Sequence, residues 1–484
     1  MAVFVSGCAS VVPQEVTRSQ LATQAGEDRQ SALADIEPVR GPVSLEEAIA
    51  RALKYNLERR TRMMEEALAL NQLDVSKYDM LPRMVAAAGY SERSEFLTTR
   101  SIDSVTGAPS LANPSISSDK KHTVGDLGLT WSLLDFGLSY YTAKQNADRV
   151  LIATERRRKA MHLLIQDVRT AFWRTAGAQK LRADVRKAIE LAEDALVDAR
   201  KAEAERVRSP LDSLRYQRQL LENVRLLEAI EHDLSTARVE LAHLINAPLA
   251  LDLKVAEPRE SVNRRLLDLP LPEMEETAIL RNADLREQFY SAKIARDESH
   301  KVLLRLFPNL SFNLNLKHDD DRFLVHNRWN EAGALLSFNL LNLLSAPAQK
   351  RLADAGVAVA DQRRVATQMA VLAQVHVARL QYASAHQQFT RADAIYTVDE
   401  RINRIIGAGE RAETQSKLDR VSSNTTTILS LLRRYQALAL LHAAASKLQA
   451  TMGVEPTLPS VRESSLDELK LVAAEFLRQT QGEP

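Results

Sequence analysis

Residues whose types and spacing could do chemistry are few in this chain, and they do not form a catalytic set. The ten histidines form no zinc-protease motif, and no Walker or Rossmann phosphate loop is present. The run His318-Asp319-Asp320-Asp321 offers carboxylates to a cation, but it lacks the spaced ligands of a calcium loop and is more typical of a solvated loop tip. We therefore expect no enzyme, no cofactor and no metal site.

Two carboxylates, Asp212 and Asp419, have a more informative position. Each follows a leucine and lies one turn into a helix that begins after a predicted reversal of the chain. If several copies of the chain share one axis, each acid repeats around it, and a ring of carboxylates at a constriction attracts cations and repels anions. The alternative is a simple acid at a helix N-terminus, stabilised there by the macrodipole.

The elements that position both acids belong to one long stretch that occurs twice. Residues 134–246 match residues 341–453 under the constant shift 341 − 134 = 207, without a gap. Under this shift Leu211-Asp212 coincides with Leu418-Asp419. A repeat of this length indicates duplicated architecture.

Each copy predicts one long helix and one shorter return helix. The helical pattern runs from about Ser139 to Val207, roughly 69 residues or about 100 Å. Its alanine-rich apolar stripe has the spacing of a coiled coil, and a second apolar edge predicts two neighbours, so that such helices can close into a tube. Pro210 suits the first turn of the return helix, which continues to Asn246.

Between the helices of each copy the apolar period changes to two, which predicts hairpins over residues 83–134 and 308–341. A soluble sheet packed on helices would also alternate, but the alternation favours an outer-membrane barrel. Four strands cannot close such a barrel, so several copies must share it, and three copies give twelve strands. The residues expected to face lipid are Leu127, Leu129, Trp131, Leu310, Phe312 and Leu314, and those expected to face the lumen are Ser311, Asn313 and Asn315.

Charge and apolar composition bear on two further classes, nucleic-acid binding and membrane-spanning helices. The chain has 64 Lys and Arg against 63 Asp and Glu, so its charge gives no reason to expect a nucleic-acid partner. The basic run Arg156-Arg157-Arg158-Lys159 has acids around it on a predicted helix and is typical of a solvated face. No apolar run reaches about 18 residues, so we expect no membrane-spanning helix, whereas barrel strands carry a weaker signal.

The single cysteine, Cys8, lies in Val5-Ser6-Gly7-Cys8-Ala9-Ser10, which resembles a bacterial lipobox. In such a motif the cysteine becomes the lipidated first residue of the mature protein. The preceding signal is too short to be complete, which predicts a truncated start. The alternative is a chance cysteine in a disordered leader.

These signals divide the chain into five segments. A truncated signal with the lipobox and an extended tether occupies 1–43, and the first repeat, opened by the capping box Ser44-Leu45-Glu46-Glu47, occupies 44–247. A linker over 248–272 leads to the second repeat over 273–456. The tail over 457–484 contains a short amphipathic helix near 466–477.

The order of short motifs resembles the TolC family of outer-membrane efflux proteins over about residues 44–456. The motifs are Ser44-Leu45-Glu46-Glu47-Ala48-Ile49, Asn56-Leu57, Leu133-Leu134-Asp135-Phe136-Gly137, Asn282-Ala283-Asp284-Leu285-Arg286 and Leu306-Phe307-Pro308-Asn309-Leu310. The resemblance implies a mainly α chain with four β-strands, a homotrimer with a twelve-stranded outer-membrane barrel, and a long periplasmic α-barrel. It also implies a passive exit duct that docks a periplasmic adaptor and an inner-membrane pump, in efflux or type I secretion.

The resemblance also assigns sites. Acids at the position of Asp419 line the closed periplasmic aperture of the family, and Asp212 is its counterpart in the first repeat. The helical tips are the expected adaptor-docking surface, with Glu203, Arg208, Ser209, Glu410, Glu413 and Ser416. Gln415 and Glu410 stand where the family's best-known gate carries its latch, so we expect a differently built gate. The competing class is a periplasmic coiled-coil scaffold without a pore, and the cargo stays open.

Overall fold

The computed structural model describes residues 14–109, 115–205, 209–257, 264–412, 414, 416–456 and 464–481. Cys8, Arg208 and Glu413, three of the predicted site residues, lie outside the described residues. The chain forms two compact units. Unit 1 comprises residues 1–62, 158–282 and 371–484, and unit 2 comprises residues 63–157 and 283–370.

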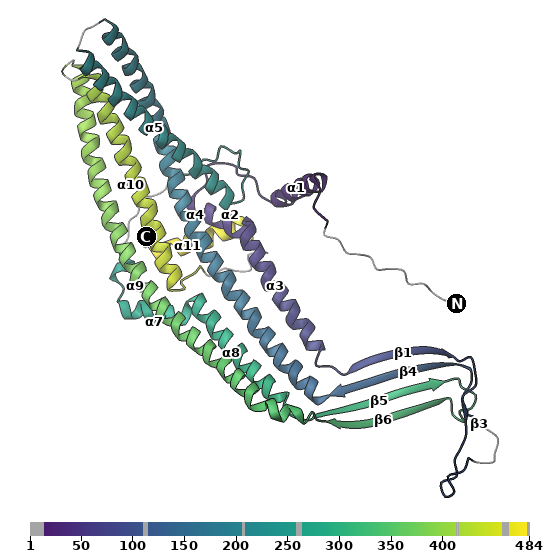
Figure 1. Cartoon of the computed structure of the whole chain (residues 1–484). Helices are drawn as coiled ribbons and strands as arrows, with labels where there is room; N and C mark the ends of the chain where they lie inside the picture. Colours follow the sequence, from purple (N-terminus) through teal and green to yellow (C-terminus); the bar gives the residue numbers. More distant parts are fainter. Residues whose placement is uncertain are drawn as a thin grey trace. The chain divides into compact units, whose positions relative to one another are not determined.

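Unit 1 is helical (Figure 1). Its long elements are the second part of α4 (Leu133–Ala204), α5 (Pro210–Leu244), the last part of α9 (Leu341–Arg411) and α10 (Lys417–Thr451). Its shorter helices are α1 (Arg18–Leu33), α2 (Leu45–Tyr55), α6 (Arg265–Asp268), α7 (Leu271–Arg281) and α11 (Leu466–Gln481). The two long helices and their return helices confirm the predicted repeat, and α11 confirms the helix predicted in the tail.

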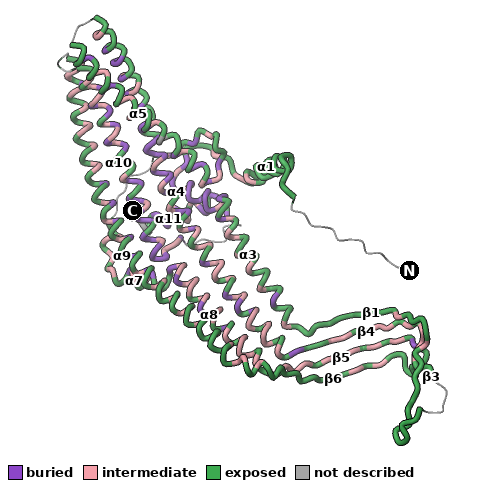
Figure 2. Tube along the Cα trace, viewed as in Figure 1, coloured by how far each residue is buried: buried purple, intermediate pink, exposed green. Residues whose placement is uncertain are grey.

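The core of unit 1 follows the predicted stripe along α4. The stripe consists of Leu164, Val168, Ala171, Thr175, Ala178, Leu181, Val185, Ala188, Ala192, Ala195, Ala199 and Ala202. Its members are buried from Leu164 to Ala199, and Ala202 at its end is half-buried. The stripe follows α4 in Figure 2. It packs with buried side chains of α9 and α10, among them Val375 and Leu448. Small residues at the seam let the helix axes approach closely, as the alanine-rich pattern predicts.

Two asparagines divide helices that the sequence pattern alone would run together. Asn56 has extended backbone dihedrals and separates α2 from α3 (Leu57–Tyr78), although the helical pattern of the sequence runs from Leu45 to about Tyr78. Its side-chain amide donates to the carbonyl of Leu244 at 3.1 Å. Asn282 separates α7 from α8 (Ala283–Leu304) in the same way, and its amide donates to Thr451 at 2.9 Å.

The two acceptors are themselves related by the repeat, since 244 + 207 = 451. Each asparagine therefore ties the break in its copy to the C-terminal end of that copy's return helix. This explains why the Asn-containing motifs occur at those positions in both copies.

The predicted extended tether is wrong over α1. Residues 18–33 form a helix that begins with a capping box of Thr17 and Gln20, whose side chains bond each other's backbone amides. Good helix-forming residues follow this cap, which is sufficient for local helix formation although none of the helix is buried.

Unit 2 contains α3, α8, the first parts of α4 and α9, and an antiparallel sheet of order β1-β4-β5-β6 (Figure 1). A separate two-stranded ribbon pairs β2 (Thr98–Thr99) with β3 (Ser115–Ile116). The four strands of the sheet are β1 (Arg83–Glu92), β4 (Lys121–Ser132), β5 (Asn309–Asp319) and β6 (Arg328–Ser337). Among the described residues of unit 2, the buried apolar side chains are Ala143, Leu285 and Ala292, so this unit has little apolar core of its own.

Ion pairs hold α4 and α8 together in unit 2. Lys144 bonds Asp297 at 2.8 Å, and Arg286 bonds Glu155 at 2.8 Å. The carboxylates of Asp297 and Glu155 are almost completely buried, so removing either cation would leave a buried charge without its main compensation.

Among the described residues, no helix is both long and apolar enough to cross a membrane.

Two boundaries in the second hairpin differ from the prediction. The hairpin predicted over 308–341 extends too far, because β6 ends at Ser337. Asn339 explains the end, because its side-chain oxygen accepts from the amide of Leu341 at 3.1 Å and so begins α9. We also placed His318 and Asp319 in the loop, and they are the last residues of β5.

Candidate functional site

The sheet of unit 2 has one apolar face, built by the register of its central strands. Leu129 lies opposite Leu314, and Trp131 lies opposite Phe312. Because side chains alternate along a strand, all six residues predicted to face lipid lie on this face, namely Leu127, Leu129, Trp131, Leu310, Phe312 and Leu314. Leu314 is 45% exposed and Phe312 is 42% exposed in the described chain. The face is therefore apolar without being covered by the chain's own helices.

The opposite face carries the residues predicted to line a lumen. Ser311, Asn313 and Asn315 alternate with the apolar row of β5. An added Cβ at Gly128, beside Asn315, would lie 2.7 Å from the Asn315 amide oxygen, so a larger residue there would displace the Asn315 side chain. The glycine thus makes space for a polar side chain to lie across the neighbouring strand.

Charges lie on the polar face toward its loop end. Lys317 bonds Glu331 at 2.7 Å, and the indole of Trp329 donates to the same carboxylate at 2.7 Å. Trp329 and Leu335 also lie on this face, so the polar row is less regular in β6 than in β5. This part of the face combines a fixed ion pair with an aromatic ring.

The predicted solvated loop tip is wrong for Asp321, which is only 5% exposed. Its carboxylate accepts from the Ser118 hydroxyl at 2.7 Å and from the backbone amide of Asp119 at 3.2 Å. These bonds, led by that of Ser118, hold the pKa of Asp321 below its usual range. The carboxylate of Asp321 thus joins the loop after β5 to the turn before β4. An ion pair between Arg322 and Asp119, with atoms 2.7 Å apart, is a second link between these segments. No cluster of three or more metal-binding side chains occurs in the part of the chain that the structure describes.

The two acids at the helical tips are capping residues. The Asp419 amide donates to the Ser416 hydroxyl at 3.2 Å, and the Asp419 carboxylate accepts from the Ser416 amide at 3.2 Å. Asp212 and Ser209 form the corresponding amide–hydroxyl bond at 3.2 Å. The structure thus places both acids at helix N-termini, as the alternative interpretation proposed. Whether they also form a ring around an axis stays a prediction.

Asp419 also borders a hollow of about 240 Å³ between α9 and α10. Its wall is rich in hydroxyl groups and includes a second acid, Asp399. The hydroxyls belong to Ser422, Ser423, Thr426 and Thr427. The carboxylate therefore serves as a cap and also faces polar, accessible space.

The predicted docking residues are tied within their own helix pairs. Glu203 accepts from the Gln217 amide, which joins α4 to α5. Arg420 donates to the carbonyl of Asn403 at 3.0 Å and lies 3.8 Å from Glu410, which joins α10 to α9. A Cβ at Gly407 would lie 2.5 Å from the Arg420 guanidinium, so the glycine leaves room for this side chain to lie against α9.

Sequence reasoning missed the contact between the two helix pairs at the tips. Lys417 on α10 bonds Asp198 on α4 at 2.5 Å. Each partner stabilises the charged form of the other, so the bond raises the pKa of Lys417 and lowers that of Asp198. The residues are 219 positions apart, so no spacing pattern could have paired them.

Comparison with known proteins gives structural matches alone: no family model and no curated protein sequence matches the chain. The outer-membrane channel OprN superposes with a TM-score of 0.66 at 16% identity, over 88% of this chain and 95% of that one. The Campylobacter jejuni outer-membrane channel CmeC gives 0.66 at 12%, over 89% of each chain.

The open state of the Neisseria gonorrhoeae outer-membrane channel MtrE gives a TM-score of 0.63 at 16% identity, over 85% of this chain and 89% of that one. These matches span nearly the whole length of each protein, and they include both repeats. The chain therefore has a TolC-like fold, mainly helical with a small antiparallel sheet, which it shares with bacterial outer-membrane channels.

Proposed function

We propose that the chain is a TolC-family outer-membrane channel that works as a homotrimer. The observation that carries the proposal is the four-stranded sheet. Its outer strands β1 and β6 each have one edge without a partner strand among the described residues, and it has one apolar and one polar face. In lipid, an open sheet edge leaves backbone groups without hydrogen bonds, which costs several kcal/mol for each group. Three copies joined edge to edge satisfy these groups and form one twelve-stranded barrel.

Exposed apolar side chains on the helices of unit 2 support the same assembly. Leu68 and Val75 on α3 are 58% and 65% exposed, and Leu344 and Leu352 on α9 are 82% and 75% exposed. Soluble monomers rarely leave extended apolar patches open to water. Neighbouring copies cover these stripes in the proposed trimer, and the long helices of three copies then form the walls of a periplasmic tube.

In this assembly the apolar row from Leu127 to Trp131 and from Leu310 to Leu314 contacts outer-membrane lipid. Ser311, Asn313 and Asn315 line the water-filled lumen. The alternation of the two rows matches the lipid-out, water-in arrangement of outer-membrane strands. A periplasmic scaffold without a pore gives no reason for one face of the sheet to be apolar and exposed.

The helical tips form the periplasmic end of the duct in this proposal. Asp419, with Asp212 as its counterpart, lines the aperture, and the surface around Glu203, Ser209, Glu410 and Ser416 docks a periplasmic adaptor of an inner-membrane pump. The duct is passive, and the pump supplies the energy. Cys8 carries a lipid anchor in the outer membrane.

Conductance of the purified protein in a planar bilayer tests the proposal. We expect discrete, long-lived current steps and a trimer by mass measurement in detergent. A monomer or dimer without current steps would refute the channel and would favour the scaffold. A protein refolded without lipid or detergent serves as the control for inactive material.

A further inference from the structure

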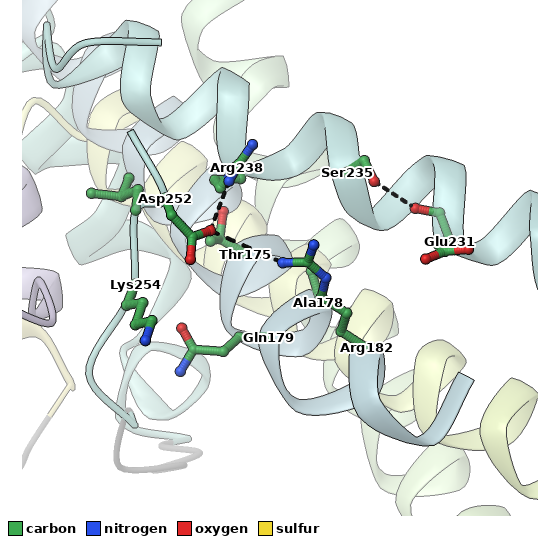
Figure 3. Close-up of a pocket in the computed structure, with 10 residues that line it drawn as sticks. Thr175, Ala178, Gln179, Arg182, Glu231, Ser235, Arg238, Asp252 and Lys254 are labelled. Carbon is green, nitrogen blue, oxygen red and sulfur yellow. Dashed lines mark hydrogen bonds and ion pairs between the residues drawn. The ribbon is translucent and has the colours of Figure 1, made fainter. Parts of the chain in front are cut away.

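A charged cavity of about 330 Å³ lies in unit 1 between α4, α5 and the segment that follows α5 (Figure 3). Its volume is within the range of small-molecule sites. Polar and charged side chains from all three elements line it together with apolar surface.

Hydrogen bonds to the backbone of the segment after α5 fix one wall of the cavity. The side chain of Gln179 accepts from the amide of Val255 at 3.0 Å and donates to its carbonyl at 3.1 Å, so it holds the segment as a neighbouring strand would. On the other side, the carbonyl of Lys254 accepts from Val43 at 2.9 Å. The buried side chains of Leu253 and Val255 anchor the segment in the core. The charges between these anchors are therefore held on a rigid frame.

The cavity has more positive than negative charge. Arg182, Arg238 and Lys254 line it together with two acids, Asp252 and Glu231. A single oxygen of Asp252 lies 2.8 Å from Arg238 and 4.0 Å from Arg182 (Figure 3). Within the described ranges, the ammonium group of Lys254 has no ion-pair partner.

Asp252 marks where a carboxylate fits in this cavity. It is 65% exposed, and water screens an ion pair at such exposure, so an incoming carboxylate can replace Asp252. Two guanidinium groups and an ammonium group offer donors for more than one carboxylate. Glu231 also lines the cavity. Its carboxylate lies 3.3 Å from the Arg186 guanidinium in an exposed ion pair, which an incoming cationic group can replace.

We propose that this cavity binds a small acidic peptide that carries at least two carboxylates and one ammonium group. Arg182, Arg238 and Lys254 bind the carboxylates, and Glu231 binds the ammonium. The inference rests on the proposed function, which places unit 1 in the periplasm. The peptide stems of the cell wall have this chemistry there, and a soluble acidic peptide is the second source.

The test uses the full chain in detergent with two probes, isolated cell-wall sacculi and the free stem tripeptide Ala-γ-D-Glu-diaminopimelate. The double variant Arg182→Gln/Lys254→Gln leaves the Arg238–Asp252 pair intact. The control Lys187→Gln/Arg200→Gln removes the same charge from exposed positions of α4 outside the cavity. We expect sacculi to sediment the wild type and the control, with at least about tenfold weaker binding of the cavity variant, and we expect the free tripeptide to compete.

Unchanged binding by the cavity variant, or an equal loss in the control, would overturn the site. Binding of the tripeptide without binding of sacculi would overturn the cell wall as the source and support a soluble peptide. Single-channel conductance separates this inference from the proposed function. If the chain is not a channel, wild type and variant both lack current; if only the cavity inference fails, both conduct and both bind sacculi equally.

Discussion

Placing an arginine at Leu314 tests the assignment of the two sheet faces most directly. Strand β5 has 11 residues, which at about 3.4 Å per residue and a tilt of about 45° span roughly 25 Å, the height of the apolar band of an outer-membrane barrel. Leu314 is the central residue of this strand, so it lies near the middle of the bilayer in the proposed barrel. An arginine facing lipid at that depth costs about 2–4 kcal/mol, or roughly 6–12 kcal/mol for a trimer.

The matched control is Asn315→Arg, one residue along the same strand. Its side chain points to the other face, directly opposite Glu331, so the added charge meets water and a carboxylate. We expect a loss below about 1 kcal/mol there. A reversible urea titration of the protein folded in phosphatidylcholine vesicles, followed by tryptophan fluorescence, gives both values. Equal losses at the two positions, or a larger loss at 315, would refute the assignment of the faces.

Three further predictions concern unit 1. Lys417→Met removes the bond to Asp198 between the two helix pairs, and we expect larger and more frequent open steps in planar-bilayer recordings. Unaltered gating would show that this bond does not stabilise the closed state. The pKa of Asp198 is lowered, so the stabilisation by this bond is fully present above the ordinary carboxylate pKa and is lost only as the pH falls through the lowered value. Wild-type recordings at pH 5 and pH 7 should therefore agree. Asp419→Ala should reduce cation selectivity and block by multivalent cations, and identical reversal potentials would exclude it from the aperture. Asn282→Ala should lower the free energy of unfolding by about 1–3 kcal/mol in denaturant titrations, since it leaves a buried carbonyl at Thr451 without its donor, and Asn56→Ala should have a similar effect; a change below about 0.5 kcal/mol in both would contradict the role of these bonds.

Much of the fold could be predicted from local patterns. The apolar stripe from Leu164 to Ala199 is buried as expected, because residues three or four positions apart always share one face of a helix. The alternation in β5 separated its apolar face from its polar face, because residues two positions apart share one face of a strand. The repeat located the second long helix, and α9 covers Leu341–Arg411.

Boundaries were less predictable where a single side chain decides them. Asn56 ends α2 and caps α3. Its side-chain oxygen accepts from the amide of Arg59 at 3.0 Å, and its side-chain nitrogen donates to a carbonyl 188 residues away. Asn339 ends the second hairpin earlier than the apolar alternation would. In both cases a specific hydrogen bond outweighs a periodicity that extends beyond it.

The sequence by itself determined that the chain has two copies of a long helix pair and a hairpin, and which face of each is apolar. Only the tertiary structure decided which charges meet. Lys417 has Glu410, Glu413 and Asp419 within about two turns along the chain, yet its partner is Asp198 on another helix pair. The cavity around Arg182, Arg238 and Lys254 likewise forms only where α4, α5 and the following segment converge. Periodicity is a property of neighbouring residues, whereas the pairing of distant charges depends on how the helices pack.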